Sequence, residues 1–191
     1  MIKGKSVYLR IIEKSDIEKV RQWRTSPEVS AYHANRDQIS ESQQENWFAK
    51  VSQSQSTQIF IICRLNGDEL GVCQYKNLDP RNRTVEVGIY LAHPDAPPSK
   101  SEEWRGVAGL EAFYLLCDYA FGYLNAHKIY GFVLAENTRA VQMNELFGLN
   151  IEGRMKQEVF YNNAYHDYLR VGALSEEFYA SAGAKMFHAK A

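Results

Sequence analysis

The sequence predicts an α/β (α+β) domain, with a mixed, mostly antiparallel sheet of about seven strands flanked by about four helices. Short segments with apolar residues at alternate positions predict half-buried strands, and segments with apolar residues every three or four positions predict helices. In chain order they give β-α-α-β-β-β-α-β-α-β-β. The chain has 191 residues, of which 45% are hydrophobic, and no internal repeat, so one domain over residues 1–191 is the simplest interpretation.

The first half of the chain predicts a meander of strands with two helices inserted after the first strand. Residues 15–24 are expected to form a helix that begins at an N-cap serine, Ser15, with Glu18 three residues later. A second helical pattern covers residues 40–51. The strands of the meander are expected at residues 7–11, 59–63, 70–75 and 85–91.

The fourth expected strand, residues 85–91, has two different faces because side chains alternate along a strand. The apolar face carries Val85, Val87, Ile89 and Leu91. The other face carries Glu86, Gly88 and Tyr90. A carboxylate therefore shares one face with a glycine and a tyrosine.

The second half predicts a long amphipathic helix, a strand, a short helix and a closing hairpin. In the long helix, apolar residues recur at helical spacing at positions 110, 113, 117, 120, 121 and 124. The later elements are expected at residues 129–134 (strand), 138–147 (helix, ended by Gly148) and on both sides of the turn at 162–165 (hairpin).

Composition and charge exclude several classes of partner. Lys and Arg total 22 against 23 Asp and Glu, and the net charge of −1 gives no general attraction to nucleic acid or anionic lipid. No apolar stretch approaches the ~20 residues of a membrane span, and the N-terminus lacks the apolar run of a signal peptide. The three cysteines form no close pair and the five histidines lack metal-ligand spacing, so we expect a cytoplasmic protein without a metal.

The segment WRGVAGLEA, residues 104–112, predicts small residues at the start of the long helix. The free N–H groups and the dipole of a helix start bind anions such as a pyrophosphate. Gly106, Ala108 and Gly109 would let such a ligand approach the backbone, and Arg105 would add a charged contact. Glycines near a helix start are also common cap and packing residues, so both interpretations stay open.

Several segments together resemble the GCN5-related N-acetyltransferase (GNAT) superfamily over almost the whole chain. In residues 133–174 a strand leads to an asparagine, a short helix, the pair Gly148-Leu149 and a hairpin. LRIIEKSDIEKVRQWR, VEVGIYLAHPD and LEAFYLLCDYAF are similar to the ribosomal-protein N-acetyltransferase branch. The resemblance implies a GNAT fold splayed between strands four and five, acetyl-CoA as co-substrate, and direct attack of an amine in a ternary complex.

A narrower resemblance concerns the acceptor. Residues 22–48, QWRTSPEVSAYHANRDQISESQQENWF, look similar to acetyltransferases acting on nucleotide-linked 4-amino sugars, as in the pseudaminic-acid pathway. In such enzymes the first helices wall the acceptor pocket, which implies Trp23, Arg24, His33 and Trp47 as acceptor-site candidates. The alternative is that Trp23 and Trp47 are core residues on their helix faces.

On the donor side, the resemblance aligns the superfamily's pyrophosphate loop with residues 104–109. Trp104 and Val107 depart from its pattern, since a Gln or Arg and a glycine are usual there, and the valine can crowd the loop. This puts the affinity for the cofactor in doubt. The cofactor-binding candidates are Leu91, Arg105, Gly106, Val107, Ala108, Gly109, Asn137 and Asn144.

Two asparagines take family positions. Asn137 matches the asparagine that contacts the pantetheine chain, and it also suits an ordinary helix N-cap. Asn144 stands where many relatives have a tyrosine that protonates the leaving thiolate, and an amide is no comparable acid. A hydroxyl of Tyr90 or Tyr161 would then substitute, or the thiolate leaves with help from solvent.

The expected catalytic residues lie on the fourth strand. A backbone N–H near Tyr90 and Leu91 is expected to hold the thioester carbonyl, as the resemblance implies. Glu86 is the first candidate for the base that takes the proton of the amine, directly or through water, because its face points toward the expected cleft. The alternative is a solvated strand carboxylate without a catalytic role.

Other acceptors and a different class of function stay open. A protein N-terminus, a polyamine or an antibiotic amine are alternatives. An acidic groove would favour a polyamine, whereas Arg24, Arg36 and Trp47 suit a nucleotide sugar. The departures at Val107 and Asn144 favour a non-catalytic binding module. A monomer or homodimer is expected, and the tail from about residue 177 is expected to fray or to dock on a neighbour.

Overall fold

The computed structural model describes residues 1–92 and 98–188, with side chains described for residues 1–92 and 107–188. The strands are β1 Ile2–Lys3, β2 Val7–Ile11, β3 Gln58–Arg64, β4 Glu69–Asp79, β5 Thr84–Leu91, β6 Lys128–Leu134, β7 Asn150–Tyr161 and β8 Ala164–Leu174. The helices are the 3-10 turn η1 Lys14–Asp16, α1 Ile17–Thr25, α2 Pro27–Ser30, α3 Glu41–Val51, α4 Pro98–Gly122, α5 Thr138–Leu146, α6 Ser175–Ala180 and α7 Ala182–Phe187.

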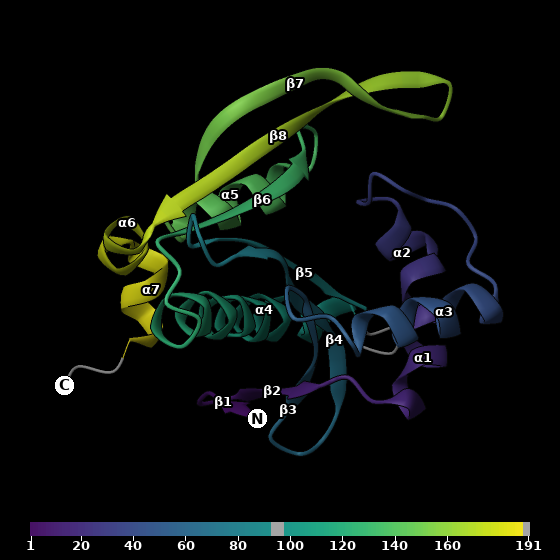
Figure 1. The fold of residues 1–191 in the computed structure, drawn as a ribbon, viewed down its shortest axis with the longest axis horizontal. Coiled ribbons are helices and arrows are strands. Elements are labelled where there is room, and N and C mark those ends of the chain that lie inside the picture. Colours follow the sequence, from purple (N-terminus) through teal and green to yellow (C-terminus); the bar gives the residue numbers. More distant parts are fainter. Residues whose placement is uncertain (93–97, 189–191) are drawn as a thin grey trace.

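The strands form one mixed, mostly antiparallel sheet in the order β1-β2-β3-β4-β5-β6-β8-β7, which confirms the predicted fold class (Figure 1). The predicted meander is β2 to β5, with antiparallel pairing throughout. The sheet has eight strands because β1 adds a two-residue strand beside β2, too short to show alternation in the sequence. The parallel pair β5–β6 holds for only three residues on each strand, which confirms the splay between the predicted strands four and five.

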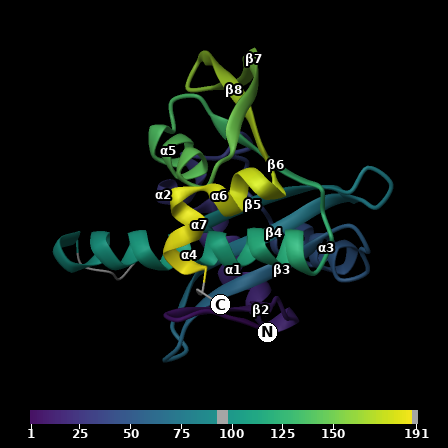
Figure 2. The same cartoon turned by 90° about the vertical axis from the view of Figure 1, so that its left-hand side faces the viewer.

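Helices cover both faces of the sheet. On one face α4 packs with α5, α6 and α7 over the larger core, and Figure 2 shows α4 running across the sheet. On the other face α1 and α3 cover a smaller core. The alternation expected for β5 is confirmed, since Val85 and Val87 are buried in the larger core and Tyr90 packs on the smaller one.

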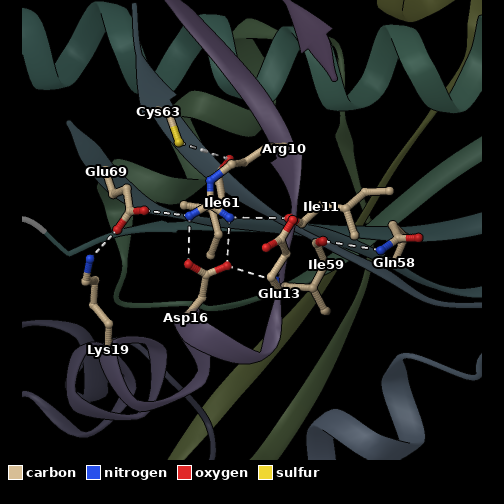
Figure 3. A network of polar contacts seen from close by, with 10 residues as sticks. All are labelled: Arg10, Ile11, Glu13, Asp16, Lys19, Gln58, Ile59, Ile61, Cys63 and Glu69. Carbon is tan, nitrogen blue, oxygen red and sulfur yellow. Dashed lines mark hydrogen bonds and ion pairs between the residues drawn. The ribbon is translucent and has the colours of Figure 1, made fainter. Parts of the chain in front are cut away.

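The start of α1 differs from the expectation. The chain turns through η1 before α1 begins, so Ser15 is not its N-cap, and Glu18 binds Arg21 and Gln22 instead. The turn is fixed by the carboxylate of Asp16, which accepts two hydrogen bonds of 2.7 Å from the Arg10 guanidinium and one from a backbone N–H (Figure 3). Burial alone raises the pKa of Asp16, but these hydrogen bonds hold it below its ordinary value.

Helix α4 begins earlier than the sequence predicted. It starts at Pro98, so the segment 104–112 lies inside the helix and not at its start. Proline is favoured in the first turn of a helix, whereas a glycine-containing segment suggested the start further on. Backbone N–H groups inside an α-helix already bond to carbonyls four residues earlier.

The C-terminal helices pack on the domain. Phe178 and Ala184 are fully buried, and the hydroxyl of Tyr179 donates to Asp118 on α4 at 2.9 Å. Gly148 ends α5 as predicted, with a φ of 79°. Residues 175–188 therefore pack on α4 and α5 rather than fraying, while docking of the tail on a neighbour stays a prediction.

Candidate active site

The splay between β5 and β6 leaves part of β5 open. Beyond Glu86, β5 pairs only with β4, while β6 continues in register with β8. Along residues 87–91 one edge of β5 therefore has no strand partner among the described residues. Free N–H and C=O groups on a strand edge can pair with an extended amide-bearing chain such as a pantetheine arm.

Glu86 lies at the point where the two strands part, opposite Tyr130 of β6. Its side chain is buried, and its carboxylate pairs with Lys76 Nζ at 2.9 Å and accepts a hydrogen bond from Asn77 Nδ2 at 2.9 Å. Tyr168 of β8 lies near enough that, after burial, the charge of Glu86 helps to raise its pKa. Glu86 is thus a partnered carboxylate and not the solvated one of the alternative interpretation.

Tyr90 lies on the same face as Glu86, four residues or about 13 Å further along the strand. The ring of His33 meets the ring of Tyr90 edge-on, with 5.4 Å between centroids. Burial raises the pKa of Tyr90, and Arg24 lies close enough to oppose that shift. Tyr90, His33 and Arg24 therefore form one cluster beside the open edge of β5.

Positive charges surround His33. Burial first, and then the charges of Arg24, Arg36 and Lys76, together lower the pKa of His33 to about 4. His33 is therefore a neutral imidazole at neutral pH. Arg24 and Arg36 bind backbone carbonyls of the loop between α2 and α3, and neither has a carboxylate partner among the described residues.

The two tryptophans of the expected acceptor site pack against the smaller core. Trp23 on α1 and Trp47 on α3 pack against the smaller core, together with Phe48 and Tyr90. Their contacts are those of core residues, as the alternative interpretation has it. Of the four acceptor-site candidates, His33 contacts the ring of Tyr90 and Arg24 lies close to it. An acceptor contact of the two tryptophans stays a prediction.

The expected pyrophosphate loop does not have the expected conformation. Ala108 is buried in the larger core, Val107 is 49% exposed, and both lie within α4. Gly109 serves packing, because a Cβ there would lie 3.0 Å from a methyl group of Leu91 on β5. Arg105 and Gly106 lie in the part of α4 outside the described side chains. Residues 106–109 offer no free row of N–H groups in this helix, so their role in binding a pyrophosphate stays a prediction.

The two asparagines near α5 have local partners. Asn137 caps α5, with its side-chain oxygen accepting from the Ala140 N–H at 3.1 Å. Asn144 is buried, and its amide donates to the carbonyl of Ala140 at 2.8 Å. The N-cap interpretation of Asn137 holds, and a contact of either residue with a cofactor stays a prediction.

The structure adds two residues that the sequence did not single out, Lys76 and Asn77, and gives Arg36 a contact that the sequence did not predict. Lys76 and Asn77 follow from register, because Lys76 lies opposite Glu86 once β4 and β5 pair. Arg36 lies in a loop without periodicity, and its guanidinium lies 3.4 Å from the ring centroid of Tyr161 at the end of β7. This contact joins the loop between α2 and α3 to the tip of the β7–β8 hairpin, which extends over that side of the molecule (Figure 1).

The described part of the chain shows neither a group of side chains for a metal ion nor a helix for a membrane span. Within residues 1–92 and 98–188, no group of three or more His, Cys, Asp or Glu is placed to hold a metal ion. Within the same residues, no helix combines the length and the apolar character needed to cross a bilayer.

A splayed sheet with an open central strand edge defines a fold suited to binding an extended acyl carrier. The sequence profile described as "Acetyltransferase (GNAT) domain" matches residues 6–150. Because this match covers more than half of the chain, the chain belongs to the GNAT acetyltransferase family and is an acyltransferase.

Two known relatives and one crystal structure align with most of this chain. The chain is 25% identical over 175 residues to the spermidine N(1)-acetyltransferase of Escherichia coli K12, covering 92% of this chain and 89% of the relative. It is 25% identical over 170 residues to the spermidine N(1)-acetyltransferase of Vibrio cholerae, covering 89% and 94%. The crystal structure of a V. cholerae spermidine N-acetyltransferase in complex with CoA and spermine superposes with a TM-score of 0.80 at 23% identity, covering 90% of this chain and 97% of that chain.

Proposed function

We propose that this chain transfers the acetyl group of acetyl-CoA to a primary amine of a small molecule, and that a polyamine is the first acceptor class. The main support for acetyl transfer is the open edge of β5 over residues 87–91, in a chain of the GNAT family. The polyamine is supported by the two spermidine acetyltransferases that are 25% identical to this chain over nearly its whole length.

The donor would lie along β5. Backbone groups of residues 87–91, which have no strand partner on one edge, would pair with the amides of the pantetheine arm, and an N–H near Leu91 would hold the thioester carbonyl. When bound, acetyl-CoA supplies the activated acyl group. Asn137 at the start of α5 lies on the neighbouring wall, after the end of β6.

The acceptor amine must lose its proton, and two residues of this chain can accept it. Glu86 is the first candidate, although Lys76 and Asn77 already bind its oxygens. His33 is the second candidate, because it is neutral at pH 7. The positive charges around His33 also disfavour a protonated amine beside it, so a nearby acceptor nitrogen is held closer to its neutral, reactive form.

A second acceptor class is favoured by the same charges. Arg24, Arg36 and Lys76 all act on His33, whereas a polyamine carries several positive charges of its own. An amine that also bears a phosphate, such as a nucleotide-linked 4-amino sugar, would find complementary groups there. This narrower function rests on the cluster of cations, whereas the polyamine rests on the relatives.

The experiment is an acceptor panel with purified protein. CoA release is measured with spermidine, a UDP-linked 4-amino sugar and a peptide with a free N-terminus, each against the matched compound whose amine is already acetylated. Turnover of spermidine alone supports the polyamine, and turnover of the sugar nucleotide alone supports the second class. If no amine is turned over while acetyl-CoA binds in calorimetry, the proposed transferase function is wrong for these acceptors. Absence of acetyl-CoA binding at millimolar concentration would favour the non-catalytic binding module.

A further inference from the structure

The ring of Tyr161, at the end of β7, lies between two other planar groups. The guanidinium carbon of Arg36 lies 3.4 Å from its centroid, and the ring of His166 stacks on it with 3.6 Å between centroids and 4° between planes. Two groups that close cannot share one face of a ring, so they lie on opposite faces. The ring of Tyr161 is therefore fixed by a sandwich of Arg36, Tyr161 and His166.

Both outer layers of this sandwich are themselves held. Arg36 donates to the carbonyls of His33 at 3.1 Å and Ala31 at 2.6 Å. His166 Nδ1 lies 2.7 Å from the carboxylate of Glu136, directly before the cap residue of α5. The sandwich thus joins the loop between α2 and α3, the β7–β8 hairpin and the loop between β6 and α5.

The hydroxyl of Tyr161 is the exception in this arrangement. It is shielded from solvent and has no hydrogen-bond partner among the described residues. Two other tyrosines of the domain have hydroxyl partners: Tyr179 donates to Asp118 at 2.9 Å, and Tyr114 lies 3.1 Å from His188 Nδ1. A buried polar group without a partner is unfavourable, so a hydroxyl held rigidly in that state points to a ligand that completes it.

We infer that the hydroxyl of Tyr161 forms a hydrogen bond with the bound acceptor, and that Arg36 and His166 hold its ring in place for that contact. The inference rests on the proposed function. Arg36 connects the sandwich directly to His33, whose ring contacts Tyr90 beside the open edge of β5. A neutral phenol both donates and accepts, so it suits a polar group next to the reactive amine, such as a hydroxyl, an amide or a second amine.

The test is the variant Tyr161→Phe, which keeps the ring and its stacking and removes only the oxygen. Kinetics are measured with the acceptor of highest kcat/KM in the panel. The acceptor KM is expected to rise about three- to tenfold, as for the loss of one hydrogen bond, with the KM for acetyl-CoA unchanged. The melting temperature of the ligand-free protein is expected to stay the same or to rise, because the variant removes an unpartnered buried group.

Tyr165→Phe is the matched control, because Tyr165 lies on the same hairpin and is 64% exposed. Its kinetics are expected to equal those of the unchanged protein. An unchanged acceptor KM in Tyr161→Phe overturns the inference while the proposed function stands. A clear fall in the melting temperature also overturns it, because the hydroxyl would then have a structural role. If the unchanged protein turns over no amine, the proposed function fails first and the inference fails with it.

Discussion

Glu86 and His33 are the two candidates for the base that takes the proton of the amine, and their electrostatic surroundings are opposite. Glu86 is negative but carries an ammonium and an amide as partners, whereas His33 is neutral and lies among three cations. A carboxylate with these partners can act as the base, or it can only hold Lys76 and Asn77 in place. Substitution can therefore distinguish a base from a residue that positions Lys76.

The substitution Glu86→Gln keeps the shape and removes the charge. If Glu86 takes the proton of the amine, kcat/KM for the acceptor is expected to fall about 100-fold or more. If it only holds Lys76 and Asn77, the fall is expected to stay below about tenfold, because those contacts are hydrogen bonds and one ion pair. Steady-state kinetics from pH 6 to pH 9 measure this, with His33→Gln in parallel. A larger loss in His33→Gln than in Glu86→Gln would assign the base to His33.

His33 also predicts how stability depends on pH. Its pKa of about 4 in the folded chain is below the ordinary 6.5, so the unfolded chain binds more protons between these values. The free energy of unfolding therefore keeps its full contribution from neutral His33 above pH 6.5 and loses it as the pH falls toward 4. Between pH 7 and pH 5 this lowers the free energy of unfolding by about 2 kcal/mol. Urea unfolding of the protein and of His33→Gln at both pH values measures it. Equal losses of stability in the two proteins would contradict the shifted pKa.

At the scale of elements, regular patterns were predictable and irregular starts were not. The alternation of β5 separates Val87 from Glu86 in the sequence as in the structure, because successive side chains of a strand point to opposite faces of the sheet. The cap predicted at Ser15 is wrong, because this turn is fixed by Arg10, which lies on β2 and binds Asp16. For the same reason the sequence does not predict the contact between Arg36 and Tyr161, which are 125 positions apart and share no local pattern.

Arg10 is expected to hold α1 on the sheet. It connects β2 to Asp16 before α1 and to Glu69 of β4 (Figure 3). Arg10→Met leaves Asp16 buried without its cation and is expected to lower the free energy of unfolding by about 2–4 kcal/mol. Arg154→Met is the matched control: Arg154 forms an exposed pair with Asp167, so a loss below about 1 kcal/mol is expected. Equal losses in urea unfolding would show that the contacts of Arg10 stabilise the fold no more than an exposed ion pair does.

At the scale of the molecule, the two helices after β8 connect the walls of the candidate site to the core. The ring of Phe178 on α6 stacks on Phe147 after α5 and on Tyr114 of α4, and it contacts Phe121 of α4. The sequence predicts only a tail from about residue 177, because a six-residue helix has too few turns to display a buried face. Since α4 and α5 flank the splayed strands, packing at Phe178 would also position the proposed donor side of the site.

The substitution Phe178→Ala tests whether this end of the chain belongs to one cooperative unit. Phe178 is 0% exposed, so the cavity and the lost burial are expected to lower the free energy of unfolding by about 3–5 kcal/mol. Phe160→Ala is the control, because Phe160 is 57% exposed on the hairpin and its loss is expected to cost less than about 1 kcal/mol. Urea unfolding followed by circular dichroism gives both values, and calorimetry with acetyl-CoA on the folded variants reports the donor side. A loss below 1 kcal/mol for Phe178→Ala would mean that α6 and α7 can detach without unfolding the domain. In that case weaker acetyl-CoA binding could not be ascribed to the packing of α4 and α5.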